Sequence, residues 1–255
     1  MTALLQVHAL GKWFGGLSVF DDVSFDLEED TALGLIGPNG AGKSTLAACI
    51  SGFMRPDAGT VNFAGVSTST MSPDRLCRAG LVRMFQHPHL LLRESAFENV
   101  LVGTHSLGRA RRVGALYRSR RIRTEECRLA AAAWDAMVQV GCEGLASMPA
   151  AALTAGQQRL VAVARALACR PRLVILDEPA AGLNETETER LTEALLVVKA
   201  SGISLLIIEH DLELVMAVSD RMIVLAEGSL IADGPPDVVR ASPRVVETYV
   251  GGSLR

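Results

Sequence analysis

Short apolar runs separated by polar turns recur along the chain, and they are of two kinds. The first kind lies near the N-terminus, where glycine and aspartate turns separate strand-like segments at residues 4–10, 19–27 and 60–63, a pattern typical of a small antiparallel sheet. The second kind is mostly apolar and alternates with helical stretches, at residues 81–85, 173–176, 203–208 and 222–226. Such runs are typical of parallel strands buried on both faces. The pattern predicts an α/β fold with a mostly parallel sheet and an N-terminal antiparallel β subdomain.

Two further segments depart from this pattern. Residues from about 103 to 152 are rich in Ala, Arg and Leu and poor in strand formers, so they predict a helical insertion. The end of the chain, residues 228–255, predicts a hairpin followed by a short helix. We expect a single domain over residues 1–255, with a helical subdomain at approximately residues 87–165.

Composition excludes several classes of protein. The chain has 255 residues, of which 49% are apolar, and a formal net charge of −3, so it has enough residues to bury one large core. Its apolar runs are all shorter than the about 20 residues that span a bilayer. The first ten residues lack the basic region and long apolar stretch of a signal peptide. We therefore expect a cytoplasmic chain unless a partner recruits it to a membrane.

The cysteines are odd in number, are scattered and form no CxxC pair, which argues against a disulfide framework and against a zinc site. We expect all five to be buried thiols: Cys49, Cys77, Cys127, Cys142 and Cys169.

A glycine-rich segment joins the apolar run at 32–36 to a helical stretch and reads GPNGAGKST. Its glycines allow backbone angles and close approaches that a Cβ would block, and the following helix offers its N-terminal amides to an anion. Lys43 is expected to reach the β- and γ-phosphates, Ser44 to ligate Mg²⁺, and Thr45 to donate to a phosphate. A glycine-rich turn with an exposed lysine is the alternative, which the complete spacing disfavours. The predicted nucleotide-binding residues are Gly37, Pro38, Asn39, Gly40, Ala41, Gly42, Lys43, Ser44 and Thr45.

Two acids follow the buried run LVIL at residues 173–176. Asp177 is predicted to emerge at the carboxyl edge of the sheet beside the phosphate loop and to bind Mg²⁺. Glu178 is then placed to deprotonate a water that attacks the γ-phosphate. An acid here could instead cap a helix that starts after Pro179. His210 ends another apolar run, which favours a contact with the γ-phosphate at the same edge.

The conjunction of the phosphate loop with VRMFQ, LTAGQQR, LVILDEP and IIEHD resembles the ATP-binding subunit of an ABC transporter over nearly the whole chain. The resemblance implies ATP and Mg²⁺ as cofactors and a head-to-tail pair of ATPase subunits, each ATP lying between one subunit's phosphate loop and the other's signature motif. It assigns Gln86 as a metal and transmembrane-contact sensor, Glu178 as the base and His210 as a switch. Phe14 resembles the aromatic residue that stacks on adenine; Trp13 competes for that role, and either residue could be part of the core.

The signature segment implied by the resemblance consists of Thr154, Ala155, Gly156 and Gln157, and it departs from the family pattern LSGGQ. Thr154 keeps a hydroxyl that can donate to the partner's γ-phosphate, whereas Ala155 adds a Cβ near the ligand. Asn184 stands where the family has an aspartate. These departures put in doubt whether both composite ATP sites work equally well.

Within that family, the strings FGGL, FQH, GQQR and EPAAGLNETET resemble one of the two ATPases of bacterial branched-chain amino-acid importers. This resemblance implies a second, different ATPase subunit, two membrane permeases and an extracytoplasmic binding protein, with the chain peripheral at the cytoplasmic face of the plasma membrane. Cargo across the group includes amino acids, amides and small carboxylates. An exporter ATPase and a soluble ABC ATPase stay open as alternatives. A small-molecule kinase would lack the LTAGQQR string.

Seven arginines fall within fifteen residues of the expected insertion, at positions 109, 111, 112, 118, 120, 121 and 123. A solvated basic face is one interpretation. Attraction to anionic lipid is another, worth about 1 kcal/mol per residue near a membrane. Nucleic acid is disfavoured by the net charge and by the lack of a base-reading module.

Overall fold

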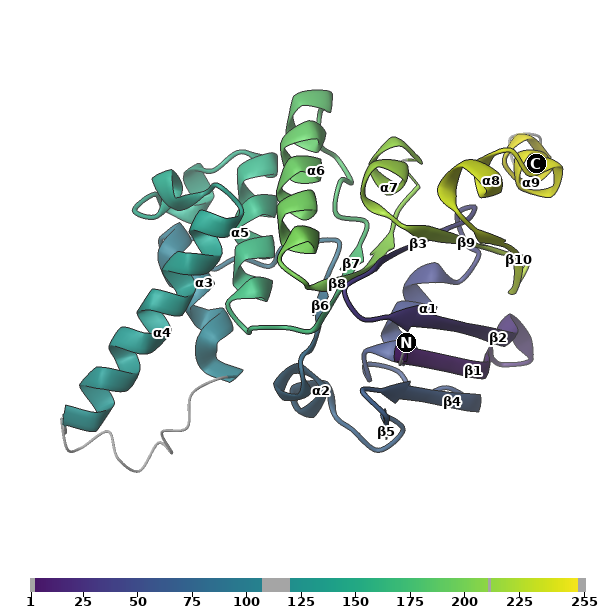
Figure 1. Cartoon of the computed structure of the whole chain (residues 1–255), viewed down its shortest axis with the longest axis horizontal. Coiled ribbons are helices and arrows are strands. Elements are labelled where there is room, and N and C mark those ends of the chain that lie inside the picture. The colour runs from purple at the N-terminus through teal and green to yellow at the C-terminus, as the bar shows by residue number, and fades with distance from the viewer. Residues whose placement is uncertain (1–2, 107–119, 211, 252–255) are drawn as a thin grey trace. The chain divides into compact units, whose positions relative to one another are not determined.

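The computed structural model describes residues 3–106, 120–210 and 212–251 (Figure 1). The chain divides into two compact units, which we name the core unit and the helical unit. The core unit comprises residues 1–86, 172–181 and 199–255, and the helical unit comprises residues 87–171 and 182–198. The helical unit therefore extends past the approximate segment 87–165 and also takes in a second stretch of chain.

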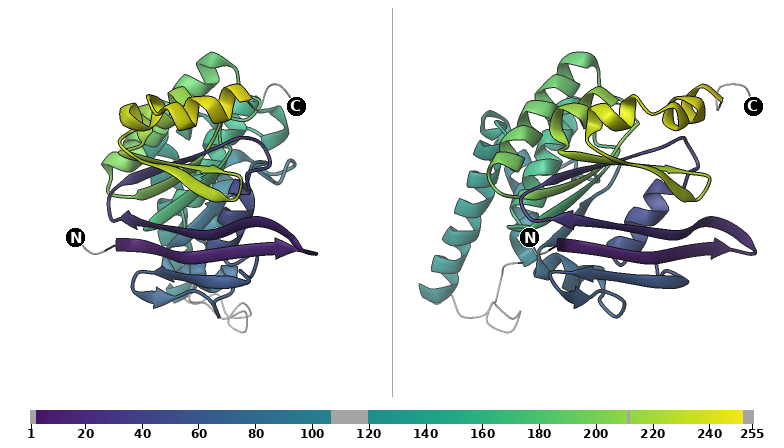
Figure 2. Two further views of the ribbon diagram at one scale, coloured as in Figure 1. Left: turned by 90° about the vertical axis from the view of Figure 1, so that its right-hand side faces the viewer. Right: turned by 45° about the vertical axis from the view of Figure 1, so that its right-hand side comes forward.

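The first sheet of the core unit has four antiparallel strands in the order β2-β1-β4-β5. They are β1 (Ala3–Phe14), β2 (Leu17–Glu28), β4 (Ala58–Phe63) and β5 (Val66–Ser67). β1 and β2 run together as a long ribbon (Figure 2). Both strands are longer than the apolar runs suggested, because shifts in register near Ala9, whose φ is 46°, let pairing continue past a break in the alternation. The predicted antiparallel sheet is confirmed.

The second sheet of the core unit has six strands in the order β10-β9-β3-β8-β7-β6. All neighbours are parallel except the edge pair of β9 and β10. The strands are β3 (Ala32–Ile36), β6 (Leu81–Met84), β7 (Leu173–Asp177), β8 (Ser204–Ile208), β9 (Arg221–Ala226) and β10 (Ser229–Gly234). β3, β7 and β8 are buried along their whole length, as their apolar runs predicted. Parallel pairing brings their carboxyl ends to one edge of the sheet.

Helices complete the core unit. They are α1 (Lys43–Ile50), α2 (Pro73–Ala79), α7 (Leu212–Val218), α8 (Pro236–Arg240) and α9 (Pro243–Gly251). One hydrophobic cluster joins Leu46 and Ile50 of α1 to Phe20 of the first sheet and Leu35 of the second. Two helices follow the C-terminal hairpin where one was predicted, because Ser242 and Pro243 start a new helix after α8 ends.

The helical unit contains α3 (Ala96–Gly103), α4 (Arg120–Gln139), α5 (Ala155–Leu167) and most of α6 (Glu185–Ala200). In the described part of this unit, three short 3₁₀ turns lie between them, at Thr104–Ser106, Glu143–Leu145 and Ala150–Ala152. α3 packs against both α4 and α5 around the fully buried Val100, Ala133 and Met137. α3 begins with a capping box in which Ser95 and Glu98 satisfy each other's backbone amides.

Not every predicted environment is observed for the cysteines. Cys49 and Cys142 are buried, and burial raises the pKa of Cys49 to about 11 and that of Cys142 to about 12. Cys77 and Cys169 are half-buried. Cys127 is exposed, so the expectation of a buried thiol is wrong there: residue 127 lies on the solvent-facing side of the long helix α4.

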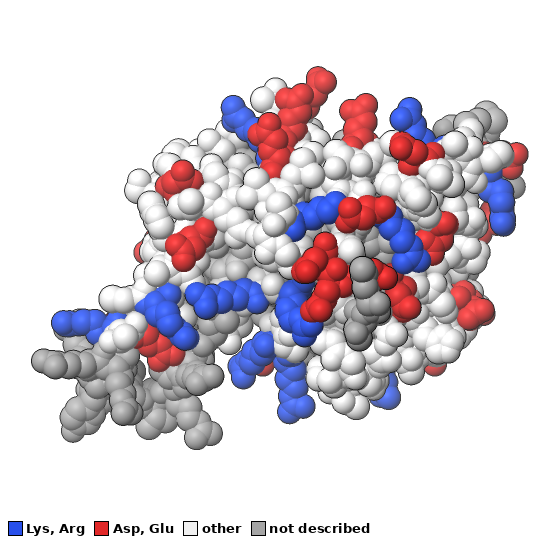
Figure 3. Space-filling view, in the orientation of Figure 1, with Lys and Arg blue, Asp and Glu red and all other residues white. Residues whose placement is uncertain are grey.

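Charged side chains of both signs are interleaved on the face shown in Figure 3. In the described part of the core unit, the surface ion pairs include those of Arg172 with Glu29, Lys199 with Asp220 and Arg221 with Asp233. Exposed pairs of this kind contribute about 0–1 kcal/mol each.

The arginine-rich segment is described only in part. Residues 109, 111, 112 and 118 lie outside the described residues, as do the side chains of 120 and 121. Arg123 is exposed on α4. Within the described part of the chain, no helix has the length and apolar character needed to cross a membrane.

Candidate functional site

The phosphate loop connects the end of β3 to the start of α1, as its sequence predicted. Gly37 has φ 153° and Gly42 has φ 95°, which L side chains rarely adopt. A Cβ on Gly37 would lie 2.0 Å from the carbonyl oxygen of Leu225, so the loop can pass this strand only as glycine. Gly42 is the N-cap of α1, and among the described residues no side chain caps that end. The first amides of α1 are therefore available to an anion.

Lys43 is buried and lies over its own loop. Its Nζ donates to the carbonyl oxygen of Gly37 at 2.7 Å and to that of Pro38 at 3.0 Å. Burial lowers the pKa of the lysine below its ordinary value, and the nearby carboxylates Glu178 and Asp177 oppose this change. The ammonium group is thus held at the mouth of the loop, where a phosphate would replace the two carbonyl contacts.

Ser44 and Asp177 meet at the carboxyl edge of the sheet. The exposed Ser44 donates from its hydroxyl to Oδ1 of Asp177 at 3.1 Å, and Asp177 is 4% exposed. A hydroxyl and a carboxylate are oxygen donors of the kind that Mg²⁺ prefers. This pair therefore fits a divalent cation held between the chain and a phosphate, and it is the pair that the sequence predicted.

Arg83 is a neighbour of Asp177 that the sequence reading missed. Its guanidinium binds Oδ2 of Asp177 at 2.6 Å, and both side chains are buried. The signal was present, because a charged residue interrupts the apolar run at residues 81–85. A cation buried in a strand normally has a partner.

Glu178 adopts an unusual backbone conformation directly after β7. Its φ is 48°, in the left-handed region that costs a residue other than glycine on the order of 1 kcal/mol. Its amide donates to the carbonyl oxygen of Ile208 at 2.8 Å, and its Oε2 accepts from Nε2 of Gln86 at 2.6 Å. The next helix begins only at Glu185 and Asn184 precedes it, so the alternative that Glu178 caps a helix after Pro179 is wrong.

His210 follows β8, and the preceding Glu209 is fully buried. One oxygen of Glu209 accepts from the amide of Ala180 at 2.6 Å. The other oxygen accepts from the amide of His210 at 3.0 Å and lies 3.3 Å from its Nδ1. Glu209 therefore ties the segment after Glu178 to the histidine, and this contact was not predicted because it joins residues that are 29 positions apart. The His210 side chain is 60% exposed.

Phe14 ends β1 and is 49% exposed, so it is not part of the core. Nζ of Lys12 lies 5.2 Å from the centroid of its ring. Trp13 is half-buried and packs over Gly11, where a Cβ would lie 2.6 Å from the indole. Phe14 therefore presents the more accessible ring for stacking on a planar ligand.

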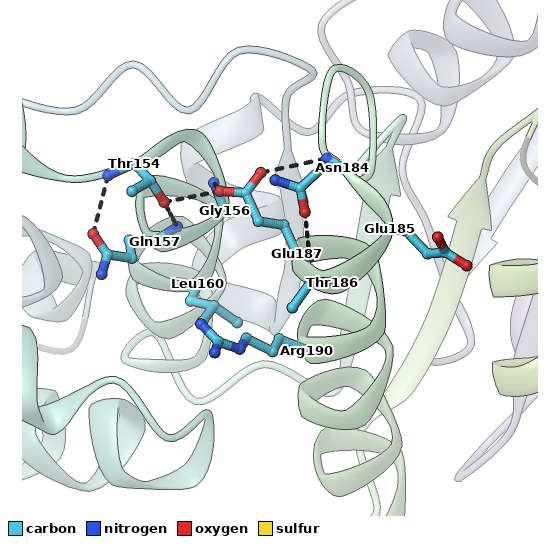
Figure 4. Close-up of a pocket in the computed structure, with 9 residues that line it drawn as sticks. All are labelled: Thr154, Gly156, Gln157, Leu160, Asn184, Glu185, Thr186, Glu187 and Arg190. Atoms are coloured by element: carbon cyan, nitrogen blue, oxygen red, sulfur yellow. Dashed lines mark hydrogen bonds between the residues drawn. The ribbon is translucent and has the colours of Figure 1, made fainter.

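The signature segment opens α5 in the helical unit (Figure 4). Thr154 is the N-cap: its Oγ1 accepts from the amide of Gln157 at 3.3 Å, and Oε1 of Gln157 accepts from the amide of Thr154 at 3.0 Å. Ala155 is exposed, so its extra methyl group meets no crowding within the segment. The substituted segment therefore starts a helix with a complete capping box.

Glu187 of α6 points into the same cluster (Figure 4) and was not predicted. Its Oε1 accepts from Oγ1 of Thr154 at 2.9 Å and from the amide of Gly156 at 3.1 Å. These hydrogen bonds lower the pKa of Glu187 below its ordinary value. Asn184, which replaces the family aspartate, caps α6 by accepting from the amide of Glu187 at 3.0 Å. The available signal was the spacing Asn-x-x-Glu, which is typical of a capped helix start.

A cavity of about 460 Å³ adjoins this cluster. It is lined by Thr154, Gly156, Gln157, Leu160, Asn184, Glu185, Thr186, Glu187 and Arg190, all of which belong to the helical unit (Figure 4).

Comparison with known proteins gives the family. The ABC transporter family model matches residues 20–181. The chain is 35% identical to the high-affinity branched-chain amino acid transport ATP-binding protein BraF of Pseudomonas aeruginosa and 34% identical to LivG of Escherichia coli, which bears the same description. Each alignment covers 97% of this chain and 98% of the relative.

Solved structures agree. A crystal structure of an ATP-binding cassette of an ABC transporter in its ADP conformation matches with a TM-score of 0.86 and 32% identity, covering 98% of this chain and 100% of that one. A nucleotide-free cassette matches with a TM-score of 0.84 and 32% identity, covering 97% and 99%. The chain therefore belongs to the ABC transporter family, as one of its ATPase subunits.

Proposed function

We propose that this chain hydrolyses ATP to power an importer of branched-chain or related amino acids, amides or small carboxylates. The observation that carries the proposal is the edge of the six-stranded sheet, where the phosphate loop lies with Asp177, Glu178 and His210. The choice of importer rests on the similarity to BraF and LivG.

Phosphate binding falls to the loop from Gly37 to Thr45. Its amides and the N-terminus of α1 would surround the β- and γ-phosphates, and Lys43 would turn from the carbonyl oxygens of Gly37 and Pro38 to the phosphate oxygens. Ser44 and Asp177 would hold Mg²⁺. When bound, this ion would neutralise charge on the phosphate oxygens. Phe14 would stack on the adenine.

Glu178 would take the proton of the attacking water. Its carboxylate is oriented by the amide of Gln86, which donates to Oε2 at 2.6 Å, so Gln86 acts on the base through a hydrogen bond. Gln86 would also sense the metal and contact the permease. The backbone of His210 is held by the buried Glu209, which leaves the imidazole exposed to meet a phosphate.

The signature residues Thr154, Ala155, Gly156 and Gln157 would face a nucleotide held by a second ATPase subunit of the same fold, in a head-to-tail pair that we expect to be a heterodimer. Two permeases and, indirectly, an extracytoplasmic binding protein would complete the transporter. The chain would then lie at the cytoplasmic face of the plasma membrane, as one ABC ATPase domain whose helical unit is a subdomain.

The first test is the Glu178→Gln variant expressed in its native membranes and trapped with ATP. We expect ATP to stay bound, turnover to stop, and two permeases and a second ATPase to be purified with the variant. Lys43→Ala is the matched control, in which ATP binding itself is lost. Normal hydrolysis by Glu178→Gln would refute the assignment of Glu178 as the base. Recovery of an exporter, of ribosomes or of the chain alone would refute the proposed role in an importer.

A further inference from the structure

A buried arginine binds one of the proposed metal ligands, Asp177, and has no role in the function described so far. Arg83 belongs to β6, between Val82 and Met84, which are both buried. Its own side chain is 7% exposed. Placing a charge in such a strand is costly unless the charge is paired, so its contacts indicate what it does.

The guanidinium of Arg83 connects β7 to α1. One terminal nitrogen binds Oδ2 of Asp177 at 2.6 Å and donates to the carbonyl oxygen of Ser44 at 3.4 Å. The other terminal nitrogen donates to Oγ of Ser51, the C-cap of α1, at 3.5 Å. A single side chain therefore contacts the acid and both ends of the helix that starts at the phosphate loop.

Two aromatic rings also contact the guanidinium. Its central carbon lies 4.8 Å from the ring centroid of Phe85 and 5.9 Å from that of Phe53. The two rings pack edge to face with centroids 5.1 Å apart. Cation–π contacts favour a charged guanidinium and limit its motion, so the cation is held in place before any ligand binds.

The two oxygens of Asp177 are consequently not equivalent. Oδ2 is bound to Arg83, whereas Oδ1 accepts from the hydroxyl of Ser44. By holding Oδ2, the arginine leaves Oδ1 to Ser44, the other proposed metal ligand. It also neutralises the carboxylate, which weakens the attraction of that carboxylate for a second cation.

We propose that Arg83 is a positioning residue that holds Asp177 through Oδ2 and, by its charge, lowers the affinity of the site for the divalent cation. The inference rests on the proposed function, in which Ser44 and Asp177 hold Mg²⁺. A purely structural ion pair would predict only that its loss destabilises the fold.

The test uses the full chain in the Glu178→Gln background, saturated with ATP in the absence of metal. The measured quantity is the free Mg²⁺ concentration that gives half of the Mg²⁺-dependent rise in Tm. Arg83→Met removes the charge and keeps the length of the side chain, and Arg83→Gln removes the charge but keeps a donor for Oδ2. Arg83→Lys restores a cation. Arg221→Met, which breaks the exposed pair with Asp233, is the matched control.

We expect Arg83→Met and Arg83→Gln to lower the half-saturating Mg²⁺ concentration by about fivefold or more. Without metal, both variants should have a lower Tm than the parent, and the loss should be smaller for Arg83→Gln. Arg83→Gln therefore serves as the test if Arg83→Met fails to fold. Arg83→Lys and Arg221→Met should have the same half-saturating Mg²⁺ concentration as the parent. If the neutral variants lower Tm but leave the Mg²⁺ requirement unchanged or raised, the inference is overturned. A parent whose Tm does not respond to Mg²⁺ contradicts the metal assignment itself, and the inference with it.

Discussion

The hydroxyl of Thr154 donates its single hydrogen to Oε1 of Glu187 at 2.9 Å, and the amide of Gly156 donates to the same oxygen at 3.1 Å. A carboxylate of α6 therefore occupies two donors that the signature segment would offer to a nucleotide (Figure 4). For a phosphate to take these donors, Glu187 must move or exchange its contacts, since a hydroxyl has only one hydrogen to give.

The first prediction concerns the space between Gly156 and Glu187. A Cβ on Gly156 would lie 2.7 Å from the Glu187 side chain, so Gly156→Ala should lower the free energy of unfolding by about 1–3 kcal/mol. In a Glu187→Ala background the loss should be smaller, because the contacts with Cγ at 2.7 Å and Cδ at 2.8 Å are gone and only the contact with Cβ, at 2.9 Å, is left. Denaturant unfolding of the four proteins measures this difference.

Gly144→Ala is the control for that cycle, because a Cβ at Gly144 meets nothing within 4 Å. Its effect should be equal in both backgrounds. Equal effects of Gly156→Ala in both backgrounds would contradict the proposed crowding.

The second prediction is a pH dependence. Hydrogen bonds from Thr154 and Gly156 hold the pKa of Glu187 below its ordinary value of 4.5. The carboxylate therefore contributes stability that is complete above that ordinary value and is lost as pH falls through the lower, folded-state pKa. The difference in unfolding free energy between the parent and Glu187→Gln should be constant at neutral pH and shrink under acid. In a Thr154→Val background, which lacks the hydroxyl donor, the acid-dependent part should be smaller.

The third prediction concerns Lys43, whose pKa is lowered chiefly by burial. A bound phosphate raises it again, so ATP binding at alkaline pH should take up a proton, and ATP affinity should fall as pH rises through the pKa of the free protein. Calorimetry with ATP and EDTA in buffers of different ionisation enthalpy measures the uptake. It should increase from about pH 7 to about pH 9. Lys43→Arg stays protonated throughout and should show no such increase, whereas equal uptake by both proteins would contradict the prediction.

Local signals explain what the sequence could predict. The buried strands were visible as largely apolar runs, and the phosphate loop as glycines at fixed spacing beside Lys43, because a strand, a turn and a helix start each depend on neighbouring residues. Tertiary pairs were invisible for the opposite reason. Arg83 meets Asp177 across 94 residues, and Thr154 meets Glu187 across 33. The exposure of Cys127 likewise depends on which face of α4 is covered, and loose apolar spacing left that face undefined.

The last prediction separates the stability of the Glu178 position from its chemistry. Glu178 has φ 48°, and its amide is held by the carbonyl oxygen of Ile208 at 2.8 Å, so the chain must keep this conformation whatever residue stands there. Glu178→Gly and Glu178→Ala both remove the carboxylate and should both lose hydrolysis. The glycine variant should nevertheless be more stable than the alanine variant by about 1 kcal/mol, since only alanine brings a Cβ into the left-handed region. At Glu189, an exposed position inside α6, the same pair should rank in the opposite order, because there alanine is the better helix former. Thermal unfolding of the four variants measures the order of stability of glycine and alanine at each position. If alanine is as stable as glycine at position 178, the strain does not exist, and the geometry of the base is then set by its hydrogen bonds with Ile208 and Gln86.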